Sequence, residues 1–133
     1  MDADVALEIL KFSVDPSRPL YEQFVERIRF AIARGELEPG ARLPSVRELA
    51  AAIRVNPTTI QRTYQELERE RLIVSFRGQG TFVTRDEAAI EASRRALARE
   101  AVARLRETAE SLGLTVQQLI DLAQAEEDGS RGG

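Results

Sequence analysis

The sequence of 133 residues contains no cysteine and no histidine. Without cysteine the chain cannot form a disulfide framework. The lack of both residue types also removes the usual zinc ligands and the usual general base of an enzyme. No apolar run approaches the length of about 18 residues that a membrane span needs, and the first residues, MDADVALEILKF, are acidic where a signal peptide is basic. The composition therefore favours a cytoplasmic protein that uses no metal or other cofactor and is not an enzyme.

Charge is distributed unevenly along the chain. The formal net charge of −3 by itself argues against a nucleic-acid partner. Residues 18–85, however, contain 12 arginines and 8 glutamates, whereas the segments on either side are acidic. Arginine suits contacts with phosphate and guanine, although the preference for arginine over lysine, which occurs only at Lys11, is equally typical of a GC-rich genome. The middle segment is the candidate for binding nucleic acid.

Two helices are predicted in the first half of this basic segment. The first lies between Pro19 and Gly35, because apolar residues recur there at every fourth position. The second is short and covers residues 46–53. It starts with the S-x-x-E pattern of a capping box, formed by Ser45 and Glu48.

The stretch RVNPTTIQRTY contains a proline that starts a third helix rather than breaking one. Asn56 is a favourable N-cap, and Pro57 occupies the first helical position, where its missing N–H costs nothing. Val55 and Ile60 then have the spacing of a hydrophobic staple. This helix is expected to run to about Arg69.

The predicted third helix has two different faces. Its apolar face carries Ile60, Tyr64 and Leu67. Polar and basic residues point the opposite way or flank that direction: Thr58, Gln61, Arg62, Gln65 and Arg69. Only about three residues separate it from the preceding helix, which indicates a helix-turn-helix with the second helix as the DNA-recognition helix. A helical hairpin in a protein core would give a similar pattern.

A β-hairpin is predicted directly after the third helix. Residues 72–76 and 81–84 are rich in β-branched and aromatic side chains, and the glycine-bracketed RGQG joins them. Three helices followed by a hairpin is the order of a winged helix. Arg77 at the hairpin tip is by itself a solvated turn charge, but in this order it is a candidate for entering a minor groove, where glycine permits close approach of the backbone.

Residues 19–83, PLYEQF to GQGTFV, resemble the DNA-binding domain of the GntR family of bacterial transcription regulators. The patterns G-x-L-x-P-G-x-R-L-P-S-x-R-E-L-A and G-x-G-T-F-V carry the resemblance, and V-N-P-T-T with Y-x-E-L-E is similar to the YtrA-type subfamily. Members of that subfamily have a short helical dimerisation tail. The resemblance implies a homodimeric repressor of an operon, with transporter operons near its own gene and autoregulation as typical targets. The sequence identifies no small-molecule effector.

The resemblance also implies which residues contact DNA. Arg47 matches an arginine that contacts the operator, and Gly78 matches a wing glycine in the minor groove. The base-contacting end of the recognition helix matches Asn56, Thr58, Gln61 and Arg62, and neighbours complete the candidate set: Ser45, Thr59, Arg77 and Gln79. Many relatives have arginine where this chain has Pro57 and Gln61, so the operator is expected to differ. Gln61 suits adenine, and Arg62 suits guanine or a phosphate.

The tail contains a long amphipathic helix, predicted over residues 86–112, and a shorter one that begins after Gly113 with Thr115 and Gln118 as a capping box. A helix pair this small encloses little, so its apolar residues pack either on a second copy or back onto the winged domain. We favour a symmetric dimer, which implies a pseudo-palindromic operator. The candidate dimerisation residues are Ile90, Leu97, Ala101, Leu105, Leu112, Leu119 and Ile120.

The predicted fold is mainly α-helical with a small β-hairpin. An N-terminal arm (1–17) precedes a winged helix-turn-helix domain (18–85), a helical dimerisation region (86–125) and a disordered tail (126–133). The alternative function is a winged-helix protein-interaction module without DNA binding. Such a module would tolerate acids at positions 58, 61 and 62, but in this chain these residues are neutral or basic. A fragment of an enzyme is less compatible with the short chain, whose one catalytic lysine candidate is Lys11.

Overall fold

The computed structural model describes residues 2–132 of the chain. They fall into two compact units, which meet between Arg94 and Arg95 in the sequence. Within the described residues, no helix has the length and apolar character needed to span a bilayer.

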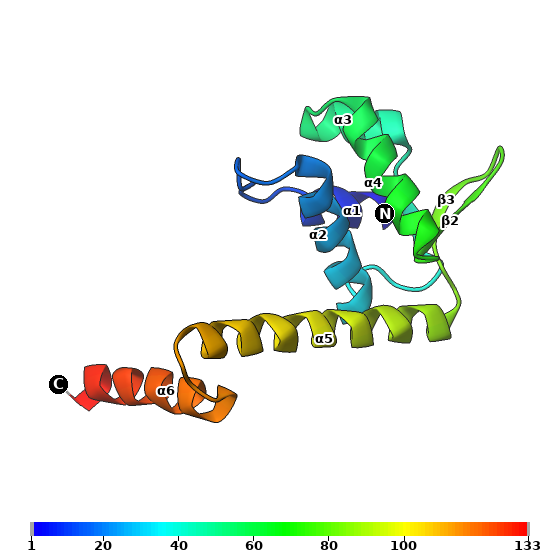
Figure 1. The fold of residues 1–133 in the computed structure, drawn as a ribbon. Helices are drawn as coiled ribbons and strands as arrows, with labels where there is room; N and C mark the ends of the chain where they lie inside the picture. The colour runs from blue at the N-terminus through cyan, green and yellow to red at the C-terminus, as the bar shows by residue number, and fades with distance from the viewer. Residues whose placement is uncertain (1, 133) are drawn as a thin grey trace. The chain divides into compact units, whose positions relative to one another are not determined.

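Helices dominate the structure, and one small sheet accompanies them (Figure 1). This confirms the predicted fold class, a winged helix with a helical C-terminal region. The elements are α1 (Asp2–Ile9), α2 (Leu20–Arg34), β1 (Arg42–Leu43), α3 (Val46–Ile53), α4 (Pro57–Arg69), β2 (Ile73–Phe76), β3 (Gly80–Val83), α5 (Glu87–Ser111) and α6 (Val116–Gly132). The bounds of α3 and α4 are those that the sequence predicts.

The caps that the sequence predicts at the starts of α3 and α4 are present. The hydroxyl of Ser45 accepts a hydrogen bond from the backbone N–H of Glu48 at 3.1 Å. The side-chain oxygen of Asn56 accepts one from the N–H of Thr58 at 2.9 Å. Each cap satisfies a donor that the first helical turn leaves unpaired. The two helices therefore begin where their sequence signals place them.

The hairpin β2–β3 is antiparallel, with Ile73 opposite Val83 and Phe76 opposite Gly80. Strand β1 pairs with the other edge of β3 and completes a three-stranded sheet in the order β1-β3-β2. The sequence predicts the hairpin but only an extended segment at β1, because two residues carry no alternation pattern. This third strand ties the base of the hairpin to the segment that precedes α3.

The core of the first unit lies beneath the inner face of α4, which contacts α2, α3 and β2. Its largest fully buried side chains come from every one of these helices and from the sheet region, and they include Ile28, Leu49, Ile60, Leu67 and Leu72. Burying apolar side chains of this size is the main favourable term in folding. It also fixes which face of α4 points outward.

Tyr64 fastens α4 to the segment before α3. Its side chain is 5% exposed, and its hydroxyl donates to the carbonyl oxygen of Pro44 at 2.7 Å. Burial, with a smaller contribution from the charge of Glu48, raises the pKa of Tyr64. The phenol therefore stays neutral and remains a hydrogen-bond donor.

The N-terminal segment is a correction to the prediction. The sequence predicts an arm over residues 1–17, but Asp2–Ile9 form helix α1, and Met1 lies outside the described residues. Ala6, Ile9 and Leu10 are buried in the core of the first unit, and Arg27 donates to the carbonyl of Ile9 at 3.1 Å. These apolar residues have helical spacing in the sequence. A helix this short is stable only when it packs against a core, and that core is formed by segments distant in the chain.

The C-terminal segment is a second correction. The sequence predicts disorder over residues 126–133, but α6 continues through Gly132, and Gly133 lies outside the described residues. Residues 123–127, AQAEE, are strong helix formers, and Gly129 in the helix interior costs only about 1 kcal/mol relative to alanine. Charge and low hydropathy therefore did not exclude a helix here.

The Tyr64 hydrogen bond gives a test of the packing of α4. We expect Tyr64→Phe to lower the free energy of unfolding by about 1–3 kcal/mol, because it leaves the buried carbonyl of Pro44 without its donor. Urea denaturation followed by circular dichroism measures the loss. Tyr21→Phe removes a hydroxyl from a half-exposed ring and serves as the control, with an expected change below about 0.5 kcal/mol. Equal losses in the two variants would contradict this role of Tyr64.

Candidate nucleic-acid interface

The outer face of α4 is polar and free of acids in its first turns. Thr58, Gln61, Arg62 and Gln65 are exposed, whereas Ile60 and Leu67 on the opposite face are completely buried. The first turn contains no acidic residue. The positive end of the helix dipole therefore faces solvent without a competing negative charge, an arrangement that suits phosphate or base acceptors.

The predicted contact residues around the start of α4 do not all have free side chains. Asn56 is exposed, but its side-chain oxygen is engaged in capping the helix. Thr59 is half-buried, and its carbonyl accepts a hydrogen bond from the hydroxyl of buried Thr63 at 2.8 Å. Thr58 and Gln61 are exposed. Asn56 thus contributes first to the shape of the helix, half-buried Thr59 presents only part of its side chain, and Thr58 and Gln61 provide the surface chemistry.

Helix α3 presents two of the predicted residues. Arg47 is exposed in the first turn of α3, a position from which a long cationic side chain reaches outward. Ser45 is exposed as well, but its hydroxyl already caps α3. Arg54, between α3 and α4, has a φ of +57° in the left-handed region, which lets the chain turn in the short connection. Arg47 is the stronger DNA-contact candidate of the two.

The tip of the β2–β3 hairpin carries the remaining predicted residues. Arg77, Gly78 and Gln79 are all exposed, and the N–H of Gln79 donates to the carbonyl of Phe76 at 2.9 Å to close the turn. Gly78 has a φ of +78°, which glycine adopts readily, and no atom lies within 4 Å of the place where a Cβ would stand. The tip is therefore open on its outer side and has a single positive charge.

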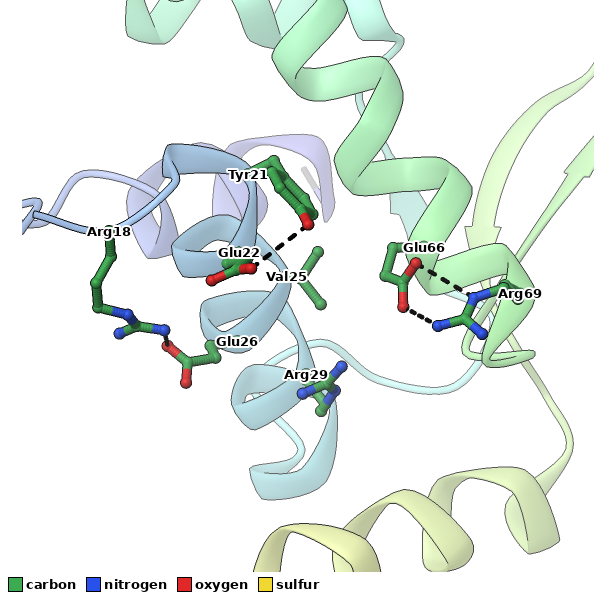
Figure 2. Close-up of a pocket in the computed structure, with 8 residues that line it drawn as sticks. All are labelled: Arg18, Tyr21, Glu22, Val25, Glu26, Arg29, Glu66 and Arg69. Carbon is green, nitrogen blue, oxygen red and sulfur yellow. Dashed lines mark hydrogen bonds and ion pairs between the residues drawn. The ribbon is translucent and has the colours of Figure 1, made fainter. Parts of the chain in front are cut away.

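A groove of about 410 Å³ separates α2 from α4 (Figure 2). Its charges largely neutralise one another: Arg18 pairs with Glu26 at 3.0 Å, and Arg69 pairs with Glu66. The hydrogen bond from Arg69 lowers the pKa of the Glu66 carboxyl. Because cations and carboxylates alternate along this groove, it has no strong preference for an anion.

The structure brings Arg62 onto an aromatic ring that the sequence analysis does not single out. The guanidinium carbon of Arg62 lies 3.8 Å from the centre of the Tyr21 ring, and its Nη2 donates to the Tyr21 hydroxyl at 3.2 Å. Tyr21 belongs to the first turn of α2 and is half-buried. Forty-one positions separate the two residues in the chain. Periodicity and spacing cannot find such a contact, because it arises from the packing of α2 against α4.

The candidate dimerisation residues occupy different environments. Ile90 packs against the core of the first unit of the same copy, and Leu97 is 9% exposed. The others are half-buried or exposed, and the exposed apolar residues of the second unit include Ala101, Val102, Leu105, Leu112, Ile120 and Leu122. Intramolecular packing, the alternative that the sequence leaves open, therefore accounts for Ile90. An uncovered apolar surface remains on the later part of α5 and on α6.

The connection between α5 and α6 follows its sequence signals. Gly113 has a φ of +71°, and the N–H of Leu114 donates to the carbonyl of Ala109 at 2.8 Å. The hydroxyl of Thr115 accepts from the N–H of Gln118 at 3.1 Å, and the Gln118 side chain accepts from the N–H of Thr115 at 2.8 Å. This reciprocal pair is the predicted capping box, and it fixes the start of α6.

Comparisons with known proteins agree with the winged-helix arrangement. The sequence model of the family described as "Bacterial regulatory proteins, gntR family" matches residues 20–83. The uncharacterized HTH-type transcriptional regulator YhcF of Bacillus subtilis is 40% identical over 105 residues, which are 79% of this chain and 87% of that protein. The HTH-type transcriptional repressor YtrA of the same organism is 45% identical over 73 residues, 53% of this chain and 56% of that protein.

A solved structure supports the same relationship. The GntR family transcriptional regulator from Listeria monocytogenes is 38% identical, with a TM-score of 0.77 over 84% of this chain and 98% of that chain. The similarity thus extends over nearly the whole of a solved regulator and beyond the winged domain.

The cap at the start of α4 can be tested separately from any binding. We expect Asn56→Ala to lower the free energy of unfolding by about 1 kcal/mol, because the N–H of Thr58 loses its acceptor. Asn56→Asp keeps an acceptor at the same place and is expected to remain near wild type. Urea denaturation of the three proteins measures the difference. Wild-type stability of Asn56→Ala would show that the cap contributes nothing.

Proposed function

The chain belongs to the GntR family of bacterial regulatory proteins, and on that premise we propose that it is a homodimeric repressor that binds a pseudo-palindromic operator through α4 and the β2–β3 wing. Members of this family are DNA-binding regulators of transcription, so a catalytic role is not part of the proposal. The observation that carries it is the outer face of α4, polar and free of acids in its first turns, beside an open glycine turn at the wing tip. Such a regulator works on DNA in the cytoplasm.

Recognition follows from the chemistry of the exposed side chains. We place the N-terminal half of α4 in a major groove, with Thr58 and Gln61 toward base edges. Arg47 on α3 supplies a phosphate contact that fixes the orientation of the domain. Arg77 and Gly78 approach the neighbouring minor groove, where a glycine permits the backbone to come close.

Dimerisation is proposed from the surface of the second unit. Leu105 is 36%, Leu112 is 58% and Leu122 is 61% exposed in a single copy. Large apolar side chains left exposed on neighbouring helices are a typical sign of a protein interface. A second copy of this chain is the partner proposed here, because two recognition helices related by a twofold axis would match two operator half-sites about 34 Å apart or a multiple of that distance.

Repression follows if the operator overlaps a promoter, since a bound dimer then excludes the transcription machinery. The relative YtrA of Bacillus subtilis is named a repressor. By resemblance we propose an operon near the protein's own gene as the target, with autoregulation and a transporter among its products. The alternative, a winged helix that binds only proteins, fits less well, because no acid stands at the exposed positions 58, 61 and 62.

Binding to the DNA upstream of its own coding sequence tests the proposal. We expect a specific shift in a gel assay at low salt and an affinity that falls by roughly a thousandfold between about 50 and 200 mM salt, because phosphate contacts release counterions. Gly78→Asp is expected to weaken binding by about five- to tenfold on every operator variant, since a carboxylate at the wing tip repels phosphate.

Gly78→Asn is the matched control, because asparagine has the shape of aspartate and both tolerate a positive φ. It is expected to bind more tightly than Gly78→Asp. A protein that shifts no DNA at low salt would refute the proposed function. Equal binding by the two variants would instead remove only the wing from the interface.

The dimer has its own test. We expect Leu105→Arg to yield monomers in sedimentation equilibrium, because a charge at an exposed apolar position of α5 would have to be buried in the interface. Ala103→Arg introduces the same charge two positions away, on the opposite side of the helix, and is expected to leave the dimer intact. An unchanged dimer in Leu105→Arg would contradict the assignment of this surface.

A further inference from the structure

Arg62 is held in one orientation before any partner binds. Its guanidinium carbon lies 3.8 Å above the centre of the Tyr21 ring, within the range of a cation–π contact. Its Nη2 atom lies 3.2 Å from the Tyr21 hydroxyl oxygen. The residue nevertheless remains exposed to solvent. The ring therefore covers one face of the guanidinium while solvent still reaches the side chain.

The acid one turn after Arg62 on α4 is already engaged. Glu66 lies four positions after Arg62 on α4, a spacing at which opposite charges usually pair. The carboxylate of Glu66 instead binds the guanidinium of Arg69, and Figure 2 shows this pair on the α4 side of the groove, opposite Tyr21. Glu66 and Arg62 interact only through their charges. Arg62 is thus left to the aromatic ring of Tyr21 rather than to a carboxylate.

Stacking leaves the chemistry of arginine available. A guanidinium has five N–H donors in its plane. One of them, on Nη2, binds the Tyr21 hydroxyl, and a ring against the face leaves the others at the edge for an acceptor on DNA. A paired carboxylate would occupy that same edge. Holding the side chain in advance also reduces the conformational entropy that ordering it would cost on binding.

We propose that Tyr21 is a positioning residue for DNA recognition, which holds the guanidinium of Arg62 at the outer face of α4 so that its edge meets an acceptor on the operator. The acceptor chemistry is shared by the guanine edge and a backbone phosphate. This inference rests on the proposed DNA-binding function. It assigns a role to a residue of α2, outside the helix-turn-helix and the wing.

A double-mutant cycle tests the coupling between the two residues. The probe is a set of DNA duplexes selected by the wild-type full-length protein from a random-sequence library. We expect Tyr21→Leu to weaken binding by about two- to fivefold for each recognition helix bound, the range of an exposed cation–π contact. In the Arg62→Ala background the same Tyr21→Leu change is expected to have no further effect.

Two controls separate positioning from folding. Tyr21→Phe keeps the ring but loses the hydroxyl that accepts from Arg62, and it is expected to weaken binding less than Tyr21→Leu. Gln65→Ala changes another exposed residue of α4, three positions after Arg62, and its effect is expected to add to that of Tyr21→Leu. Thermal unfolding of each variant identifies any loss of affinity that follows from loss of structure.

The outcomes are distinct. Affinity that is unchanged or increased in Tyr21→Leu would overturn the proposal, as would a loss of the same size with and without Arg62. Failure of the wild-type protein to select any DNA would refute the proposed function itself. If Arg62→Ala relaxes the preference at one base pair, the acceptor is guanine. If it weakens all duplexes equally and lowers the salt slope by about 1, the acceptor is a phosphate.

Discussion

The burial of one face of α4 is the constraint on which the candidate interface depends. Ile60, Tyr64 and Leu67 lie against α2, α3 and the sheet, and Tyr64 adds a hydrogen bond to the carbonyl of Pro44. A helix with three anchored positions over two turns cannot rotate about its axis without exposing apolar surface. The outward direction of Thr58, Gln61 and Arg62 is therefore fixed by residues buried on the opposite face of the helix.

Helix capping and recognition draw on the same residues. Ser45 and Asn56 stand at the starts of α3 and α4, where a DNA-binding domain also presents its contacts, but each side-chain oxygen is used within the protein. Only the hydrogen-bonding groups that capping leaves unused in these two side chains are available to DNA. Residues one or more positions into each helix, such as Arg47, Thr58 and Gln61, have no such obligation to the helix start. Ser45 and Asn56 thus remain candidates for DNA contact, with their side-chain oxygens already used as helix caps.

Charged side chains are distributed unevenly over this protein. The chain is acidic overall, with a net charge of −3, yet the first turn of α4 has no acid. In the groove behind it, Arg18, Arg29 and Arg69 are each bound to a glutamate. Local pairing of this kind removes cations from the general surface potential and leaves Arg62 on an aromatic ring. The local distribution of charge, rather than the net charge, decides whether this surface is compatible with a DNA partner.

The sequence by itself determined the helices α2, α3 and α4, the hairpin and the start of α6, because caps, glycine turns and apolar periodicity act over a few residues. It also determined which face of α4 is apolar. The tertiary structure decided what depends on distant residues: the burial of α1, the pairing of β1 with β3, the packing of Ile90 on its own domain and the stacking of Arg62 on Tyr21. Each of these is a contact between segments well separated in the chain. A local pattern can show that a residue is apolar or cationic, but its partner is chosen by how the helices pack.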